Sequence, residues 1–586
     1  MHLYSLAARP TVAWLLLCAA ALLTACSDSS PEKKSDGGTD GDAGATQGPG
    51  DVDPEFDLFP RDQLLEIEIE LADEDWQRLR GEGKSINEVF SNCDTAAYDY
   101  TKFHAKLKIG AHEFADVGVR KKGYLGSISA YRPSLRVDLD EYVTEQELGG
   151  TKAITLNNSQ GDGSYAAQCL AYDQFARAGI PASRCGFARV KVNGESLGVY
   201  VSVEPVKKPF LRQHYGDDEG DLYEGSGGAD FRDEMLGAFE KKTNEDQPQG
   251  PELKALADAL TLPDDELVPA LEELLDLDEF LRFWATESLI GHWDGYTGDL
   301  NNFFVYVEPE SRKLRFIPWG TDTAYEDRHP FLPSDSWPRS ALAWARLPRR
   351  LYALPAMRER YRGVLRELLD THWEEAKLLK EIDAIAQVTS ESAKSVAVTA
   401  MRSFVSARRA RIVAELDAPA QPWTFDERVL ATCRSDASTP LNITFKTTWG
   451  NLGATSAVIG NTVSATIQGS PLVPSYVIAA AGESLDPNAL GKALRITVGN
   501  LDGSFTLFQF TLGAPSLRAG ELTLHGFETF GIVLRGQVST GAIGLETLGF
   551  VGEGRIVFDA AGTADGDEVS GRIEAKLVSG APSMAP

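Results

Sequence analysis

The spacing of apolar residues changes twice along this 586-residue chain, and the changes divide it into three parts. From Leu64 to Glu204, short stretches alternate apolar and polar residues, as half-buried strands do. From Pro251 to about Leu416, long stretches rich in Leu, Ala and Glu predict helices. After Pro422, short stretches with Thr, Val, Ile and Phe lie between Gly-, Asn- and Asp-rich turns, which is typical of a β-sandwich or barrel. We therefore expect an α+β fold followed by an all-β domain.

Several elements of the first two parts can be placed individually. We expect strands at residues 64–71, 98–108, 114–120 and 133–140, and helices at residues 72–80 and 166–178. Residues 188–192 and 199–204 flank Asn193-Gly194, which predicts a hairpin. In the helical part, residues 302–306 and 314–318 predict two buried strands that pair with each other.

The N-terminus has the features of an export signal. Arg9 supplies a positive charge, and the apolar stretch from Thr11 to Leu23 is too short for a comfortable membrane span. Leu23-Thr24-Ala25-Cys26 then matches the lipobox of bacterial lipoprotein signal peptides, so we expect cleavage before Cys26 and a lipid on its thiol. The alternative is an ordinary secretory signal. Ser27 after the cysteine resembles the outer-membrane sorting pattern of Gram-negative cells, which indicates a lipid-anchored protein of the cell envelope.

The net charge excludes some classes of partner, and the cysteine spacing indicates which cysteine chemistry is available. The formal net charge of −29 argues against nucleic acid and against anionic lipid surfaces. No Cys-x-x-Cys pattern indicates zinc. Cys169 lies in a predicted helix, and Cys185 follows the turn at Gly179 and Pro181, so the chain can double back and join the two in a disulfide. The alternative is two buried thiols.

Ordered segments across the middle of the chain resemble one known family. The segments are VGVRKKGYLGS (117–127), RPSLRVDLDEY (132–142), LNN (156–158) with Asp162, VNGESLGVYVSVEPV (192–206), GDLYEG (220–225), HWDGYTGDLNNFFVY (292–306) and FIPWGTD (316–322). Together they resemble the spore coat protein H family, the CotH kinase-like proteins, over roughly residues 64–416. The resemblance implies an atypical two-lobed protein-kinase-like fold that binds ATP with Mg²⁺ or Mn²⁺. It also implies phosphate transfer to exported coat or surface proteins.

We expect four segments in the chain. They are a signal peptide at 1–25, a flexible tether at 26–60, a CotH kinase-like domain at 61–420 and a β-domain at 425–586.

The resemblance assigns roles to residues around the two paired strands. Asp294 would orient the nucleophile, Asn302 (or Asn301) would hold a second metal, and Asp322 would be the principal metal ligand. Asp299 competes with Asp294 because it also precedes the asparagines. The alternative is that both aspartates are turn residues and that Asn301 ends a strand.

Other residues are candidates for the nucleotide. Arg120 and Lys122 belong to a basic run before Gly123 and Ser127, small residues whose backbone amides would approach the phosphates, unless the run is only a basic turn. In the resemblance, Arg132 stands where many members have a lysine, and Glu204 lies near the position of a kinase hinge that would hold adenine through its backbone.

Departures from the family leave two functions open. Arg132 replaces a lysine, although arginine is a poor substitute for a compact point charge. Gly320 removes one acid of the family's Trp-Asp-x-Asp, and the helix after Asp162 has Gln168 but no acid. The chain is therefore either a membrane-anchored kinase for envelope or exported proteins, or a non-catalytic surface protein with a structural or adhesive role.

Lipidation at Cys26 is directly testable. Because the lipobox needs the thiol as the lipid acceptor, Cys26→Ser should release the protein from membranes or block signal cleavage. Membrane fractionation and gel mobility measure this. A variant that fractionates and migrates like the wild type would show that the anchor is elsewhere.

Overall fold

The structure is a computed structural model. It describes residues 53–84, 98–123, 128–225, 227–327, 329, 332, 337–428, 438–452, 461–467, 469–483, 492–513, 517–524, 529–539 and 542–579. The signal peptide, Cys26 and most of the predicted tether lie outside these residues, as does the segment between Gly123 and Ile128. Within the described ranges, no helix combines the length and apolar character needed to cross a membrane.

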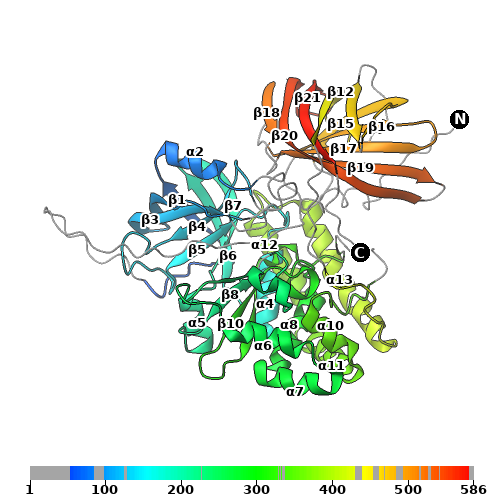
Figure 1. Cartoon of the computed structure of the whole chain (residues 1–586). Helices are drawn as coiled ribbons and strands as arrows, with labels where there is room; N and C mark the ends of the chain where they lie inside the picture. The colour runs from blue at the N-terminus through cyan, green and yellow to red at the C-terminus, as the bar shows by residue number, and fades with distance from the viewer. Residues whose placement is uncertain are drawn as a thin grey trace, which may run out of the picture.

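The first part of the chain forms a closed seven-stranded barrel, drawn in blue and cyan in Figure 1. The strands are β1 (Leu64–Glu70), β2 (Phe103–Ile109), β3 (His112–Lys122), β4 (Ser134–Asp138), β5 (Ala153–Asn157), β6 (Cys185–Val192) and β7 (Glu195–Val203). Their order is β1-β2-β3-β4-β5-β7-β6, closed by parallel pairing of β1 with β6. In β2, buried and exposed residues alternate strictly, so its apolar side chains fill the barrel. The predicted strands and the hairpin at Asn193-Gly194 are confirmed.

The packed structure begins earlier than residue 61. Asp53 forms a β-bridge with Leu148, and Leu58 and Phe59 are buried in the barrel region. The tether expected at 26–60 therefore ends by Asp53. The physical reason is that burying the apolar side chains of Leu58 and Phe59 lowers the free energy, which holds this segment against the barrel.

The second part combines helices with a small sheet of order β11-β10-β8-β9. Its strands are β8 (Leu222–Gly225), β9 (Phe239–Lys241), β10 (Phe303–Val307) and β11 (Leu314–Pro318). Its helices are α5 (Lys208–Tyr215), η2 (Asp233–Ala238), α6 (Pro251–Ala259), α7 (Asp264–Leu274), α8 (Leu277–Ile290), α9 (Tyr296–Asp299), η3 (Thr321–Thr323), α10 (Arg346–Ala353), α11 (Pro355–Thr371), α12 (Glu375–Val388) and α13 (Ser395–Asp417). The predicted pairing of β10 with β11 is confirmed, with Phe303 opposite Pro318.

Two helices fix the relation between the barrel and the helical part. Helix α2 (Asp73–Gly81) packs on the barrel through Trp76 and Leu79. Helix α4 (Ala167–Arg177) lies between β5 and β6 in sequence, but its apolar residues belong to the large core of the helical part. Phe175 of α4 contacts Phe283 of α8, with ring centroids 5.5 Å apart. Helix α4 therefore packs into the core of the helical part, although the strands before and after it belong to the barrel.

The C-terminal part is a ten-stranded antiparallel sheet with its own core, shown as a separate yellow-to-red body in Figure 1. Its strands are β12 (Ser438–Thr448), β13 (Thr462–Ile467), β14 (Ser470–Pro471), β15 (Tyr476–Glu483), β16 (Lys492–Gly499), β17 (Ser504–Leu512), β18 (Gly520–Leu524), β19 (Phe530–Ser539), β20 (Ala542–Ala561) and β21 (Glu568–Ser579). The Thr447 hydroxyl of β12 donates to the carbonyl of Ala479 in β15, although the two strands are far apart in the strand order. The sheet therefore curls back on itself. The expected fold, α+β followed by an all-β domain, is confirmed.

A disulfide joins Cys169 of α4 to Cys185 at the start of β6, with Cα atoms 5.3 Å apart. Both cysteines are buried. The bond ties α4 to the barrel strand that follows it, close to the N-terminal end of α4, which the next section places at the site.

Removing this disulfide should destabilise the protein measurably. The bond closes a loop with a sequence separation of 16, for which chain entropy gives about 3 kcal/mol. We expect reductant to lower the free energy of unfolding by roughly that amount, and the double variant Cys169→Ala/Cys185→Ala to lose its response to reductant. Denaturant titration measures both. Alkylation of both cysteines in the non-reduced protein, seen by mass spectrometry, would contradict the pairing.

Candidate functional site

Lys122 and Asp322, far apart in the sequence, meet where the barrel faces the helical part. Lys122 is the last residue of β3, and Asp322 lies in η3, directly after β11. The Lys122 ammonium lies 5.7 Å from the ring centroid of Trp319, at the end of β11. Its charge acts on Asp322, where it opposes the other effects that raise the pKa of that carboxyl. A buried ammonium therefore stands beside a half-buried carboxylate.

Asp162 brings a second carboxylate to Asp322. A Cβ atom built on Gly161 would lie 3.5 Å from Oδ2 of Asp322, so Asp322 lies against the turn that carries Asp162. Burial raises the pKa of Asp322 to about 6, and repulsion from Asp162 adds to this effect. Two neighbouring carboxylates with one lysine favour the approach of a further cation.

Asp162 is itself fixed by the start of α4. Its carboxylate accepts the backbone N–H groups of Ser164 at 2.8 Å and Ala167 at 2.9 Å, and the Ser164 hydroxyl at 2.5 Å. The Ala167 N–H is one of the N–H groups at the start of α4 that have no partner within the helix. The Asp162 carboxylate accepts it and so caps the helix. The turn that supports Asp322 is consequently rigid.

The Lys122 ammonium donates to a side-chain amide. Its Nζ donates to Oδ1 of Asn157 at 2.9 Å, and Nδ2 of Asn157 donates to Oε1 of Gln168 at 2.8 Å. The Thr321 hydroxyl donates to the Gln168 carbonyl at 3.2 Å, which ties the same network to η3. Gln168 belongs to the segment Tyr165-Ala166-Ala167-Gln168, which contains no acid, so the described bonds from Lys122 to α4 pass through two neutral amides.

Asp294 and the two asparagines form one buried network before β10. Oδ1 of Asp294 accepts from Asn301 at 3.2 Å, and Oδ2 accepts from Nδ2 of Asn302 at 2.8 Å. Asp294 has 0% of its surface exposed. This geometry favours a role for Asp294 in holding the asparagines. Its role in orienting a nucleophile stays a prediction.

Asn302 is positioned by an unusual backbone and by Gly320. Its φ is +52°, and its carbonyl accepts the N–H of Trp319 at 3.2 Å. Its Oδ1 is buried and has no hydrogen-bond partner among the described residues. A Cβ atom at Gly320, where φ is also +52°, would lie only 2.4 Å from that Oδ1. The absence of a side chain at 320 is therefore what makes room for the Asn302 amide.

The loop before β10 is also held by buried charges. Glu287 of α8 accepts the N–H of Tyr296 at 3.1 Å and of Thr297 at 2.8 Å, together with the Thr297 hydroxyl. Burial raises the pKa of Glu287 to about 7. Asp299, the competitor for the role of Asp294, is paired instead with Nε of Arg428 at 2.7 Å. Asp299 therefore has a structural partner in this fold.

Two of the predicted nucleotide-binding residues are engaged elsewhere. The Arg132 guanidinium donates to the Tyr165 hydroxyl at 3.1 Å and to the Val199 carbonyl at 2.5 Å. The Glu204 carboxylate is paired with Arg184 at 2.8 Å, and its backbone N–H donates to the Arg184 carbonyl. None of these described contacts joins Arg132 or Glu204 to Asp322, because both residues serve the barrel strands around them.

The basic run divides between the two faces of β3. Arg120 is buried on the same face of the strand as Lys122, since alternate residues share a face. Lys121 points the other way and donates to the carbonyls of Arg80 and Glu82 at 2.8 and 2.7 Å. Lys121 therefore anchors the end of α2, while Lys122 belongs to the site.

Sequence reasoning missed Asp162, Asn157 and Gln168 as members of the site. The LNN segment and the following Asp162 carried the family resemblance, so the signal was present without a role attached to it. Only the pairing of β5 and the direction of α4 place these residues beside Lys122 and Asp322.

Comparison with known proteins places this region in one family. The family described as CotH kinase protein matches residues 119–402. Inner spore coat protein H of Bacillus subtilis (strain 168) is 26% identical over 218 residues, which are 35% of this chain and 55% of that protein. Spore coat protein homolog 1 of Rhizopus delemar is 26% identical over 261 residues, which are 42% of each chain. The chain thus spans about half the length of these curated relatives.

Among solved structures, the Helicobacter pylori proinflammatory kinase CtkA is similar at 9% identity. The similarity covers 45% of this chain and 89% of that chain, with a TM-score of 0.26. At that score the likeness carries no inference about this chain. The range that matches the family model, residues 119–402, contains Lys122, Asp162, Asn302 and Asp322, and it leaves out the C-terminal strands. Through residues 119–402, this chain carries a domain of the CotH kinase family.

Proposed function

We propose that this chain is an exported CotH-type kinase that binds ATP with Mg²⁺ or Mn²⁺ and transfers phosphate to an envelope or exported protein. The observation that carries the proposal is the meeting of Lys122 and Asp322 between the barrel and the helical part. Phosphoryl transfer depends mainly on positioning and on neutralising phosphate charge. A lysine from the barrel and a carboxylate from the helical part would supply both.

The residues present fit a hard divalent cation. Such ions take oxygen ligands, and Asp322 offers a half-buried carboxylate whose pKa is raised by burial and by the neighbouring Asp162. Asn302 offers a buried Oδ1 that has no hydrogen-bond partner among the described residues. When bound, the ion would neutralise phosphate charge. Lys122 would direct its ammonium to phosphate oxygens from the barrel side.

The place of action follows from the N-terminus and from the relatives. The lipobox at Cys26 supports a lipid anchor, with the protein outside the cytoplasmic membrane. Relatives that share the domain are named as spore coat proteins and as invasins of Rhizopus delemar, which supports an exported or surface location. The net charge of −29 makes a nucleic-acid partner unfavourable.

A second function is favoured by specific contacts. Lys122 is held by the neutral amide of Asn157, Gly320 provides no second acid, and Asp294 is fully buried. A chain that keeps the fold but has lost transfer, and that serves as a structural or adhesive surface protein, would have these features. Nucleotide binding separates the two functions.

Asp322→Asn should abolish metal-dependent nucleotide binding and leave the fold intact. The substitution keeps the shape of the side chain and removes its charge. Because burial raises the pKa of the Asp322 carboxyl, the charged form is unfavourable in the folded protein, so the free energy of unfolding should stay equal or rise slightly. We expect an affinity loss of at least ~100-fold, about 2.7 kcal/mol, by titration calorimetry with ATP and Mg²⁺ or Mn²⁺. Asp265→Asn, an exposed carboxylate of α7, is the matched control and should bind normally.

Equal affinity in the wild type and Asp322→Asn would contradict the metal role. No binding in either protein at millimolar nucleotide with both metals would contradict the kinase and leave the surface-protein function.

Gly320→Asp, which restores the family's acid, should weaken binding rather than strengthen it. The new Cβ would lie 2.4 Å from Oδ1 of Asn302, whose amide is tied to Asp294. We expect a stability loss of about 1–3 kcal/mol by denaturant titration. Gly150→Asp is the matched control, because Gly150 has φ +72° and nothing within 4 Å of its built Cβ. Tighter metal binding with unchanged stability in Gly320→Asp would show that Asn302 is not a ligand.

A further inference from the structure

The segment after the CotH match is bound to the helical part along residues 421–428. The Gln421 carbonyl accepts the Tyr352 hydroxyl at 3.0 Å, and the Asp426 carbonyl accepts Nε1 of Trp344 at 2.9 Å. Trp423 and Phe425 pack against the small core that contains Trp344. We call residues 421–428 the strap. The β-domain expected to start at 425 therefore starts later, with β12 at Ser438, because the aromatic residues of the strap are covered by the helical part.

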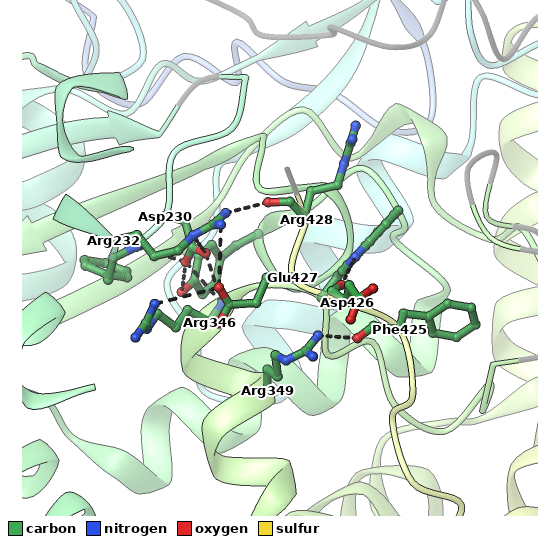
Figure 2. Close-up of polar contacts among 11 residues, drawn as sticks. Asp230, Arg232, Arg346, Arg349, Phe425, Asp426, Glu427 and Arg428 are labelled. Carbon is green, nitrogen blue, oxygen red and sulfur yellow. Dashed lines mark hydrogen bonds and ion pairs between the residues drawn. The ribbon is translucent and has the colours of Figure 1, made fainter. Parts of the chain in front are cut away.

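The main chain of the strap reaches the first residue of α9 through a charged cluster (Figure 2). The Arg428 carbonyl accepts Nη2 of Arg232 at 2.6 Å, and Nε of Arg232 lies 3.1 Å from Asp230. The Asp230 carboxylate also accepts the Arg346 N–H, at 3.1 Å, and the Tyr296 hydroxyl, at 3.2 Å. Tyr296 is the first residue of α9.

The Arg428 side chain reaches the last residue of α9. Figure 2 shows it directed away from the Asp230 cluster. Its Nε lies 2.7 Å from Oδ1 of Asp299, with side chains only 8% and 5% exposed. Its guanidinium lies 5.1 Å from the ring centroid of Trp344, and the backbone N–H of Trp344 donates to the Thr297 carbonyl. Arg428 thus contacts α9 directly through Asp299 and indirectly through Trp344.

The loop that follows α9 needs such support. Leu300 and Asn302 both have positive φ, at +60° and +52°, which side chains other than glycine adopt only at a cost in free energy. The Asn302 amide is fixed by Asp294, which precedes α9. A buried ion pair at Asp299 holds the loop start, and removing one partner would leave a buried charge uncompensated.

We propose that Arg428, which lies outside the matched CotH domain, is a positioning residue that sets the conformation of residues 296–302 and thereby the orientation of Asn302. The importance of this for catalysis rests on the proposed function. The working unit then extends from residue 53 to Arg428, and the strap connects the site to the β-domain.

The test uses the full chain and the variants Arg428→Ala, Arg428→Lys and Glu427→Gln. Glu427 is the matched control, because its carboxylate lies in the strap and pairs with Arg232 at 3.7 Å and Arg346 at 3.8 Å, neither of which belongs to α9. Hydrogen exchange of residues 296–302 measures the loop directly. In Arg428→Ala it should be faster by at least about tenfold, with exchange in α11 unchanged. Arg428→Lys should restore most of the protection, and Glu427→Gln should change it less than about twofold.

Nucleotide titration with Mg²⁺ is the second measurement. Affinity should fall at least about tenfold in Arg428→Ala and stay within about threefold in Arg428→Lys. If Arg428→Ala does not fold, Arg428→Gln with Asp299→Asn replaces it, because this pair leaves no unpaired charge, and its loop should still exchange faster.

Unchanged exchange in residues 296–302 would overturn the proposal, whatever the nucleotide result. Faster exchange with full nucleotide affinity would also overturn it, since Arg428 would then stabilise the loop without positioning the site. A wild type that binds no nucleotide contradicts the proposed function alone, and loop exchange still decides whether Arg428 sets the conformation of the loop.

Discussion

The site depends on one electrostatic contact between two parts of the fold, in which the Asp322 carboxylate lies against the turn of Asp162 and in the field of Lys122. Each partner is carried by a different structure: a barrel strand, a helix start and a strand end. The contact therefore exists only when the barrel, α4 and the β10–β11 hairpin are all in place. The disulfide between Cys169 and Cys185 secures one of these relations by tying α4 to β6. A pKa of about 6 at Asp322 shows that burial and a like charge outweigh the single lysine, and this imbalance favours a cation.

Behind this contact lies a layer of polar groups that fix the α9 loop rather than meet a substrate. Glu287 holds the start of α9 through two backbone N–H groups, and Arg428 holds Asp299, the last residue of α9. Asp294 holds the two asparagines. Such buried groups are costly unless they are fully paired, so they specify one conformation of the loop. The same layer bears on the glycine at 320, because a Cβ atom there would lie 2.4 Å from Oδ1 of Asn302.

The order of apolar patterns was enough to predict the α+β part, the β-domain and the pairing of β10 with β11, because periodicity reports directly on burial. The sequence also predicted Lys122, Asn302 and Asp322 as site residues, and the fold brings Lys122 to Asp322 and Asn302 to Gly320. It could not show that Arg132 turns toward Tyr165 and Val199, because that depends on the packing of β7 against residue 132. It also could not reveal Asp162 as the neighbour of Asp322, or Arg428 as the partner of Asp299, since both are contacts over long sequence separations. The end of the tether and the start of the β-domain are misplaced in the sequence prediction. The apolar pair Leu58-Phe59 and the aromatic residues Trp423 and Phe425 are buried against other parts of the fold, and the local sequence does not show those surfaces.

The central claim is that Asp322 and Asn302 face a divalent cation that neutralises nucleotide phosphates. The most direct measurement is the anomalous difference density of a crystal grown with Mn²⁺ and a non-hydrolysable ATP analogue. The account predicts a single strong peak at bonding distance, about 2.0–2.4 Å, from the Asp322 carboxylate, with Oδ1 of Asn302 turned toward the same ion or its water, and with Lys122 directed at a phosphate oxygen. Nucleotide density without manganese at Asp322, or manganese bound only at surface carboxylates, would contradict it.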